Sequence, residues 1–278
     1  MRLLLALFLV LWAAAPAGAA FQARAALLYN LSTGRILFER NADARIAPAS
    51  LTKIMTMYVA LDACRSRKQS LHDRIAIPAY AAKIGGSAMG LSAGEKVPLV
   101  RLLSGMAVSS GNDAATAVAL HFGGTLAGFA KMMNARAASL GMKSTQFKNP
   151  TGLPQAGHVT TARDLMRLCR AYLQAWPKAA RFHNMKFFMH KGRVSRNTNP
   201  LLGVVDGVDG LKTGWTIASG YNLIVTATRG KTRLLAIVLG CHSREARDCA
   251  AKALLEAGFR FPDSPQKATQ MLITGPGR

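Results

Sequence analysis

A serine and a lysine at helical spacing suggest nucleophilic chemistry in the first third of the chain. Ser50 and Lys53 open a segment, 49–64, whose apolar spacing predicts a helix, so their side chains should share one face. A serine hydroxyl attacks well only when a base takes its proton, and a lysine can do this if burial or other cations lower its pKa. The helix N-terminus also favours negative charge developing near Ser50. Taken alone, the motif also fits an N-cap serine followed by a solvated lysine.

Two further motifs follow in order. Ser110-Gly111-Asn112 interrupts an Ala-rich helical region, and a glycine between polar residues predicts a helix break that faces a cleft. Lys212-Thr213-Gly214 forms a short strand flanked by glycines, which would let a ligand approach the backbone. Lys212 could hold a carboxylate there and Thr213 could hydrogen-bond it. A simple kink and an ordinary surface hairpin are the alternatives.

The order of these motifs resembles that of penicillin-binding proteins and serine β-lactamases. A single S-x-x-K match carries little weight, since Ser264-Pro265-Gln266-Lys267 is another. Longer segments are similar to the D-alanyl-D-alanine carboxypeptidase family of low-molecular-mass penicillin-binding proteins. They are Ala47–Thr56, Ser109–Ala115, Asn149–Pro154 and Val208–Gly214. The resemblance covers roughly residues 21–261, nearly all of the expected mature chain.

The resemblance implies a fold and a set of roles. The fold is of the α/β (α+β) class: a β-lactamase/transpeptidase-like antiparallel sheet flanked by helices, with a helical subdomain and the site between them. The reaction is removal of the terminal D-alanine from peptidoglycan stem peptides, without a cofactor. The implied roles are Ser50 as nucleophile, Lys53 as its base, Ser110 as proton relay, Asn112 as a substrate-backbone ligand, Lys212 and Thr213 as carboxylate ligands beside Gly214, and the N–H groups of Ser50 and Trp215 as oxyanion hole.

Two departures leave the exact activity open. Many carboxypeptidases of this family carry a second β-domain and a C-terminal anchor, whereas only seventeen residues follow Phe261 here. The site domain thus resembles the soluble D-alanyl-D-alanine endopeptidases of the family, which cut peptidoglycan cross-links. Trp215, directly after the third motif, is large and is expected to affect the width of the cleft.

Two other functions compete with the peptidase. A class A β-lactamase would add a Glu-x-x-x-Asn loop to activate the deacylating water, but none of the four glutamates has an asparagine four residues on. We therefore expect no glutamate placed for this purpose, and β-lactam antibiotics should act as covalent inhibitors. A non-catalytic peptidoglycan-binding module is the third interpretation, and the intact Ser50, Lys53, Ser110 and Lys212 argue against it.

The N-terminus and the charge indicate where the protein works. A short basic start, an uncharged run from Leu3 to Ala15 and small residues up to Ala20 predict a secretory signal over 1–19. The chain has 36 Lys and Arg against 13 Asp and Glu, a net charge of +23, and removal of Arg2 leaves about +22. Export makes nucleic acid an improbable partner. We expect a periplasmic or extracellular envelope protein without a transmembrane anchor, associated electrostatically with anionic envelope polymers or headgroups.

The remaining patterns predict the elements around the site. Hairpins are expected at 25–30/36–40 and 222–228/234–240, and helices over 97–122, 125–140, 161–175 and 246–257, the last ending at Gly258. Both ends of the chain should form one antiparallel sheet in a peptidase domain over 20–261, followed by a flexible tail without a helix over 262–278. Cys241 and Cys249 could pair, Cys64 and Cys169 should be buried, and no metal-ligand spacing is present.

Overall fold

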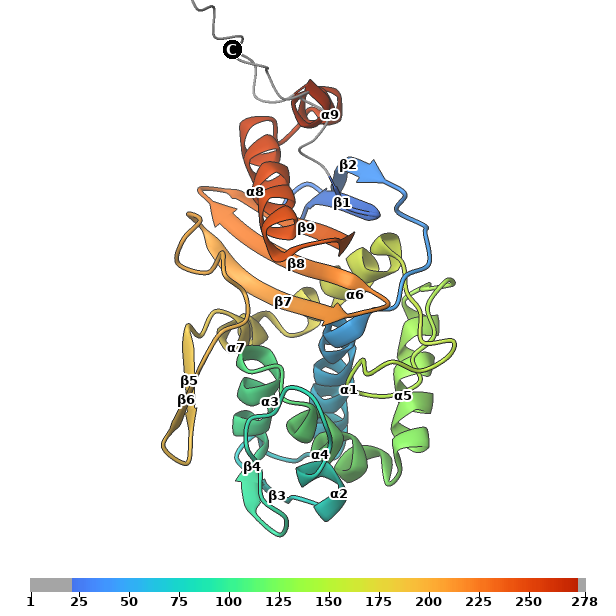
Figure 1. The fold of residues 1–278 in the computed structure, drawn as a ribbon, viewed down its shortest axis with the longest axis vertical. Helices are drawn as coiled ribbons and strands as arrows, with labels where there is room; N and C mark the ends of the chain where they lie inside the picture. Colours follow the sequence, from blue (N-terminus) through green and yellow to red (C-terminus); the bar gives the residue numbers. More distant parts are fainter. Residues whose placement is uncertain (1–21, 275–278) are drawn as a thin grey trace, which may run out of the picture.

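A five-stranded antiparallel sheet organises the molecule in the computed structural model, which describes residues 22–274 (Figure 1). Its strand order is β2-β1-β9-β8-β7. The strands are β1 (Ala25–Asn30), β2 (Arg35–Arg40), β7 (Val208–Thr216), β8 (Gly220–Arg229) and β9 (Thr232–Cys241). Ala26 pairs with Val238, so the two ends of the chain meet in one sheet, which confirms the predicted architecture. The predicted signal segment, 1–19, lies outside the described residues.

One face of the sheet is covered by α8 (Arg244–Arg260), with α9 (Pro265–Thr274) beside β2 (Figure 1). Leu28, Val225 and Leu254 are fully buried in the apolar core between this face and α8. Gly258 lies inside α8, because the helix continues to Arg260, so the predicted stop at Gly258 is wrong. The prediction of a tail without a helix is also wrong for Pro265–Thr274, where Ala268 is fully buried.

The other face packs on a 3₁₀ turn, η2 (Ala49–Leu51), and on α6 (Ala162–Ala175), and it shares one apolar core with α1 (Thr52–Ser66). The predicted apolar stripe of the 49–64 helix is buried, including Ile54, Met55 and Val59. Helix α1 is also buried on its remaining sides over most of its length, because α4, α5 and α6 all contact it. A helix surrounded in this way can hold a polar side chain away from bulk water.

The predicted helical subdomain follows α1 in the chain. Its helices are α2 (Ala79–Ala82), α3 (Leu99–Val108), α4 (Asn112–Gly123) and α5 (Leu126–Ser139), with a small ribbon of β3 (Arg74–Ala76) and β4 (Lys96–Pro98). The helical region predicted over 97–122 is interrupted between Val108 and Asn112, as the Ser110-Gly111-Asn112 motif suggested. Ser110 in this break and Thr213 on β7 line one cavity.

A separate hairpin follows α6 in the chain and precedes β7. After η3 (Pro177–Ala179) and α7 (Ala180–His183), β5 (Phe187–His190) and β6 (Arg193–Arg196) form an antiparallel ribbon outside the main sheet. Figure 1 shows this ribbon extending away from the body beside α3 and α7. No element was predicted for this segment from the sequence.

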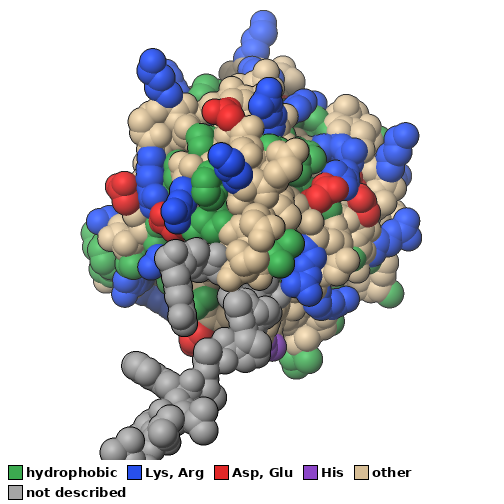
Figure 2. All heavy atoms as spheres, turned by 90° about the horizontal axis from the view of Figure 1, so that it is seen from above, with side chains coloured by type: hydrophobic (Ala, Val, Ile, Leu, Met, Phe, Trp, Pro, Cys, Tyr) green, Lys and Arg blue, Asp and Glu red, His purple; other side chains and the backbone are tan. Residues whose placement is uncertain are grey.

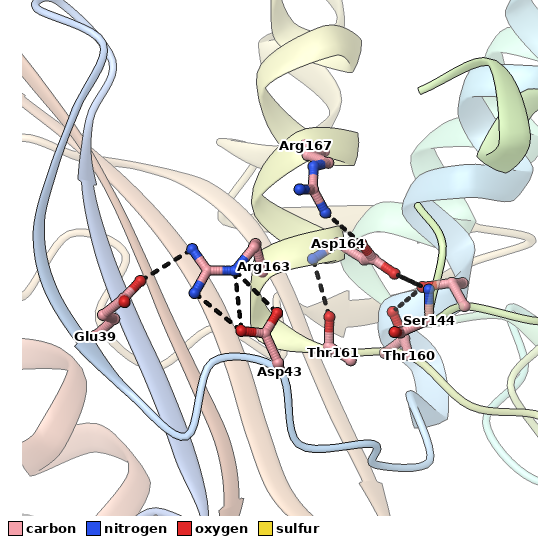
Figure 3. A network of polar contacts seen from close by, with 9 residues as sticks. Glu39, Asp43, Ser144, Thr160, Thr161, Arg163, Asp164 and Arg167 are labelled. Carbon is pink, nitrogen blue, oxygen red and sulfur yellow. Dashed lines mark hydrogen bonds and ion pairs between the residues drawn. The ribbon is translucent and has the colours of Figure 1, made fainter. Parts of the chain in front are cut away.

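The N-terminus of α6 fixes the segment that leads to Ser50 (Figure 3). The Arg163 guanidinium pairs with Asp43, Nε to Oδ1 at 2.9 Å, and with Glu39 at 3.0 Å. Thr161 caps the helix by accepting from the Asp164 N–H at 3.1 Å, which confirms the predicted start of α6. Ile46 pairs with Thr160 next to this cap. The segment between β2 and η2 is therefore fixed by ion pairs and backbone hydrogen bonds to residues 160–163 at the start of α6.

Cationic side chains are spread over the surface that surrounds this fold. Figure 2 shows Lys and Arg scattered across the face at the α9 end, with fewer Asp and Glu among them. In residues 22–274 no helix is long and apolar enough to cross a bilayer. All four cysteines are free thiols: Cys64, Cys169 and Cys241 are buried and Cys249 is exposed, so Cys241 and Cys249 are not paired.

Candidate active site

Ser50 lies at the edge of a cavity of about 450 Å³ between η2, the α3–α4 break, β7 and the start of α8. Lys53 occupies the first turn of α1, and its Nζ lies 3.0 Å from Ser50 Oγ. The two side chains therefore share one face one turn apart, as predicted. Ser50, Ser110, Thr213, Gly214 and Trp215 all line the cavity.

The amine of Lys53 is fully enclosed and its hydrogen-bond partners are fixed. Nζ donates to Asn112 Oδ1 at 2.8 Å and to the Thr151 carbonyl at 2.7 Å. A neutral amine has two N–H groups and one lone pair. With both N–H groups used by these two acceptors, the lone pair is directed at the remaining neighbour, the Ser50 hydroxyl. The arrangement suits removal of a proton from Ser50.

The electrostatics of this pocket favour the neutral amine. Lys53 has no exposed surface. Burial lowers the pKa of Lys53 well below its ordinary value, the charge of Lys212 lowers it further, and the charge of Asp113 acts in the opposite direction. A lysine with a lowered pKa can accept a proton near neutral pH, which an exposed lysine cannot do.

The break between α3 and α4 brings Ser110 to the cavity and Asn112 to the Lys53 amine. Ser110 has a φ of 59°, a left-handed conformation that non-glycine residues seldom adopt, and its side chain faces the cavity. Asn112 donates from Nδ2 to the Gly85 carbonyl at 2.7 Å while its Oδ1 accepts from Lys53. The second motif thus positions one hydroxyl in the cavity and one amide against the lysine.

A buried carboxylate holds the loop opposite this break. Asp113 accepts from the N–H groups of Met89, Gly90 and Leu91 at 2.9–3.1 Å. This fixes the loop that carries Ser87, whose carbonyl accepts from the Asn112 N–H at 2.7 Å and which lines the cavity. Asp113 follows directly after the second motif but was given no role by the sequence analysis.

The third motif lies on β7, at the edge of the sheet. A Cβ at Gly214 would lie 3.1 Å from the Ser50 backbone nitrogen, so any other residue would push β7 and η2 apart by a few tenths of an ångström. Lys212 is buried, and its Nζ donates to the Thr213 carbonyl at 3.0 Å. Thr213 Oγ1 donates to Thr198 Oγ1 at 2.8 Å. Trp215 is half-exposed and its ring lies 5.8 Å from that of Tyr221.

Charged residues of α8 complete the cavity wall, and sequence patterns gave no sign of them. Arg244, Glu245, Arg247 and Asp248 all line it. Arg247 is almost fully buried and pairs with Asp248 at 2.7 Å. Burial lowers the pKa of Lys212 to about 7, and the charge of Arg247 contributes to that shift. Lys212 and Arg247 repel each other, so an anion bound in the cavity would stabilise both charges.

One glutamate reaches the cavity, because Glu245 lines it from the first turn of α8. The expectation that no glutamate is placed to activate the deacylating water stays a prediction. Hydrogen bonds from the Glu245 N–H and from Ser243 lower the pKa of this exposed carboxyl, which is therefore ionised at neutral pH. Its contact with the cavity depends on packing of α8 against β8 and β9, which a helical pattern does not predict.

The segment Asn149–Pro154 supports the nucleophile from beneath. Asn149 Oδ1 accepts from the N–H groups of Thr151 and Gly152 at 3.2 and 2.8 Å, which shapes the turn that directs the Thr151 carbonyl at Lys53. Gly152 has a φ of 84°, and a Cβ there would lie 1.8 Å from the Ala49 carbonyl oxygen. Sequence alone marked this segment only through its resemblance to the family. Its role is to hold the base.

Comparison with known proteins agrees with this geometry. A sequence profile described as D-alanyl-D-alanine carboxypeptidase matches residues 12–243. The chain belongs to this family. It is 39% identical over 246 residues to D-alanyl-D-alanine carboxypeptidase DacC of Escherichia coli, covering 86% of this chain and 62% of that protein. The chain thus spans about three fifths of the length of the carboxypeptidases it matches.

Members with other printed names are similar as well. The chain is 32% identical to D-alanyl-D-alanine endopeptidase of Pseudomonas aeruginosa, covering 77% of this chain and 70% of that one. Among solved structures, penicillin-binding protein D2 of Listeria monocytogenes in its ampicillin-bound form superposes with a TM-score of 0.78 at 33% identity, covering 86% of this chain and 98% of that one. The predicted family and the predicted fold class are both confirmed.

Proposed function

We propose that this chain is a serine-type D-Ala-D-Ala carboxypeptidase that removes the terminal D-alanine from peptidoglycan stem peptides through an acyl-enzyme on Ser50. The observation that carries the proposal is the enclosed Lys53 amine, 3.0 Å from the Ser50 hydroxyl and anchored by two other acceptors. Membership of the family supports it. No step of the reaction calls for a cofactor or metal.

Acylation begins when neutral Lys53 takes the proton of Ser50. The Ser50 oxygen attacks the carbonyl between the two D-alanines, and the N–H groups of Ser50 and Trp215 bind the oxyanion. As the C–N bond breaks, Ser110 passes a proton to the leaving D-alanine amine and regains one from Lys53. Water then attacks the ester, Lys53 takes its proton, and Ser50 leaves with a proton returned to it.

Substrate orientation is assigned to groups in the cavity wall and directly behind it. The terminal carboxylate lies against Thr213 and Arg247 in the wall and is attracted by Lys212, which is buried behind it, since buried cations favour an anion. Asn112 donates to a substrate carbonyl while it holds Lys53. Gly214 lets the peptide backbone run along β7, and Trp215 forms the outer wall of the cavity. β-Lactam antibiotics, which carry a carboxylate next to a strained amide, would acylate the same serine.

A second activity is supported by one comparison. The chain covers a larger share of the endopeptidase relative, 70%, than of the DacC carboxypeptidase, 62%. Hydrolysis of D-alanyl cross-links would use the same Ser50 acyl-enzyme, with a longer leaving group extending past Trp215. We propose an exported protein at the periplasmic or outer face of the envelope for either activity.

Release of D-alanine from a stem pentapeptide tests the proposal. The chain from Ala20 onward should release one D-alanine per peptide, and Ser50→Ala should release none. Cross-linked muropeptides supplied in parallel measure the second activity. A protein that binds muropeptides but turns over neither substrate would contradict both activities and favour a non-catalytic binding module.

A further inference from the structure

The β5–β6 hairpin exposes an apolar face to solvent. Phe187 and Met189 are each 58% exposed, Val194 is 61% exposed and Val204 is 72% exposed. Met189 pairs with Val194 across the ribbon, and Phe187 is two residues from Met189, so these three side chains lie on one face. Phe187 and Val204 line the same small cavity. Large apolar groups gathered in this way indicate a contact with another surface.

The opposite face of the hairpin is anchored to the body. Phe188 is buried, with its ring 4.7 Å from the Arg101 guanidinium carbon. Lys191 Nζ lies 2.7 Å from Glu95 Oε2 and 2.9 Å from Ser92 Oγ. These contacts fix the ribbon on α3 and on the turn before β4. The outward side chains take no part in this anchoring.

One arginine lies on the apolar face and two other cations flank it. Arg196 pairs with Phe187 and shares its face, whereas Arg193 pairs with His190 and lies on the other face beside the turn. Residues 185–205 contain four Lys and Arg and no Asp or Glu. Lys186, Arg193 and Arg196 are exposed, and within residues 22–274 none of them has an ion-pair partner. Lys186 and Arg196 line the 130 Å³ cavity beside Phe187. We call the exposed side chains Lys186, Phe187, Met189, Arg193, Val194, Arg196 and Val204 the hairpin surface.

We propose that the hairpin surface docks onto the anionic headgroup region of a lipid bilayer. Phe187, Met189 and Val194 would enter the boundary between headgroups and acyl chains. Arg196 on the same face, and Arg193 reaching round from the turn, would contact lipid phosphates. A soluble polyanion would pair with the arginines but leave the apolar side chains in water, so a lipid surface fits both features. A two-stranded ribbon has unpaired edge groups that need water, which places it in the interface and not across the bilayer.

Docking would also orient the active-site cavity. Thr198 follows Arg196 by two residues, and its hydroxyl both lines the cavity and accepts from Thr213. The base of the hairpin is therefore part of the cavity rim. A chain bound through the hairpin would hold this rim close to the membrane surface. The proposal goes beyond the peptidase activity and does not depend on it.

Vesicle flotation tests the proposal with the chain from Ala20 onward. Vesicles of phosphatidylcholine containing about one third phosphatidylglycerol should bind it at least about tenfold more tightly than phosphatidylcholine alone. Arg193→Gln with Arg196→Gln should weaken binding about 25-fold, at about fivefold per cation. Phe187→Ser with Met189→Ser should weaken it by about tenfold or more.

Matched variants elsewhere control for charge and apolar surface. Lys131→Gln with Lys252→Gln removes the same charge from α5 and α8, and Tyr80→Ser with Ile273→Ser removes exposed apolar groups from α2 and α9. Both should stay within about threefold of the parent, since charge outside the contact acts only through the screened field. Loss of binding in the controls equal to that in the hairpin variants would overturn the proposal.

Fluorescence separates insertion from attraction by charge alone. Phe187→Trp should shift its emission to the blue on anionic vesicles and be quenched by brominated acyl chains, whereas Tyr80→Trp should show neither effect. An unquenched Phe187→Trp, or full binding by the Phe187→Ser, Met189→Ser variant, would overturn the proposal in favour of a polyanion. A dimer in sedimentation velocity that this variant dissociates would assign the surface to a second copy of the chain.

Discussion

Two regions of the molecule differ in the polarity of the side chains that they bury: the interior between α8 and the sheet, and the cavity at the outer edge of β7. Fully buried apolar side chains fill the first, among them Leu28, Val225 and Leu254. Two buried lysines, Lys53 and Lys212, lie directly behind the wall of the second, and their desolvation costs free energy that hydrogen bonds only partly offset. The comparison shows where this fold gains its stability and where it gives some up to obtain a reactive serine.

The backbone is strained beside the cavity and unstrained at the start of α8. Ala49 and Ser110 both have positive φ values, 47° and 59°, and both adjoin the cavity. Non-glycine residues in this conformation cost roughly 1–3 kcal/mol each. Helix α8, in contrast, starts at an ordinary N-cap, where Ser243 accepts from the Ala246 N–H at 3.0 Å. Changes in the cavity should therefore alter chemistry, and changes in the α8 interior should alter stability.

The largest expected effect is on chemistry. Lys53→Ala should slow acylation of Ser50 by about 10²–10⁴-fold while the fold stays intact, because it removes the only base in contact with the hydroxyl among the described residues. Stopped-flow mixing with a fluorescent β-lactam measures the acylation rate, and circular dichroism shows whether the fold is intact. Lys131→Ala, an exposed lysine, is the control. A wild-type rate in Lys53→Ala would exclude Lys53 as the base.

The second effect is on stability alone. Leu254→Ala should lower the free energy of unfolding by about 2–5 kcal/mol through the cavity it leaves in the α8 interior. Its acylation rate at a permissive temperature should stay within about twofold of the parent. Urea unfolding measures the first quantity, and Lys252→Ala on the exposed side of α8 serves as control. A Leu254→Ala variant with normal stability and slow acylation would show that the two regions are not separable.

The smallest effect is a pH dependence that belongs to the cavity. As the pH rises through about 7, Lys212 of the free enzyme loses its charge, so kcat/KM should fall by up to about tenfold per pH unit. At low pH, protonation of Lys53 should also lower it. In the complex, the substrate carboxylate favours protonated Lys212, so the alkaline fall in kcat should lie at higher pH than the fall in kcat/KM.

A peptide amidated at its C-terminus provides the control for this profile. It has no carboxylate to pair with Lys212, so its weak turnover should not decrease as Lys212 loses its charge. Profiles of kcat/KM and kcat for the two peptides decide the matter. An acid peptide whose kcat/KM is unchanged from about pH 7 to 9 would contradict the role of Lys212.

Local patterns predicted the parts of the molecule that depend on local physics. The β8–β9 hairpin, the stripe of α1 and the Thr161 cap all follow from side-chain period and turn chemistry within a few residues. The same applies to the spacing of Ser50 and Lys53. The local pattern around each motif predicted the structure of its own segment. That the three motifs converge on one site was predicted from their order and from the family resemblance.

The features that were missed depend on packing between distant segments. The Thr151 carbonyl reaches Lys53 only because Gly152 packs against Ala49. Arg247 and Glu245 reach the cavity only because α8 crosses the sheet at one particular angle. Helix α9 was missed because prolines and glycines surround it, from Pro262 and Pro265 to Gly277, and such residues are typical of a tail. Backbone proximity of this kind leaves no period in a single sequence.

The central claim is that Ser50, activated by Lys53, forms a covalent acyl-enzyme in this cavity. Intact-mass measurement after incubation with benzylpenicillin tests it most directly. We predict one added drug mass that persists, is absent in Ser50→Ala and forms more slowly in Lys212→Ala. No adduct and no drug turnover would contradict the assignment of Ser50. Rapid drug hydrolysis without an adduct, abolished by Glu245→Gln, would instead identify a β-lactamase that uses the glutamate at the cavity wall.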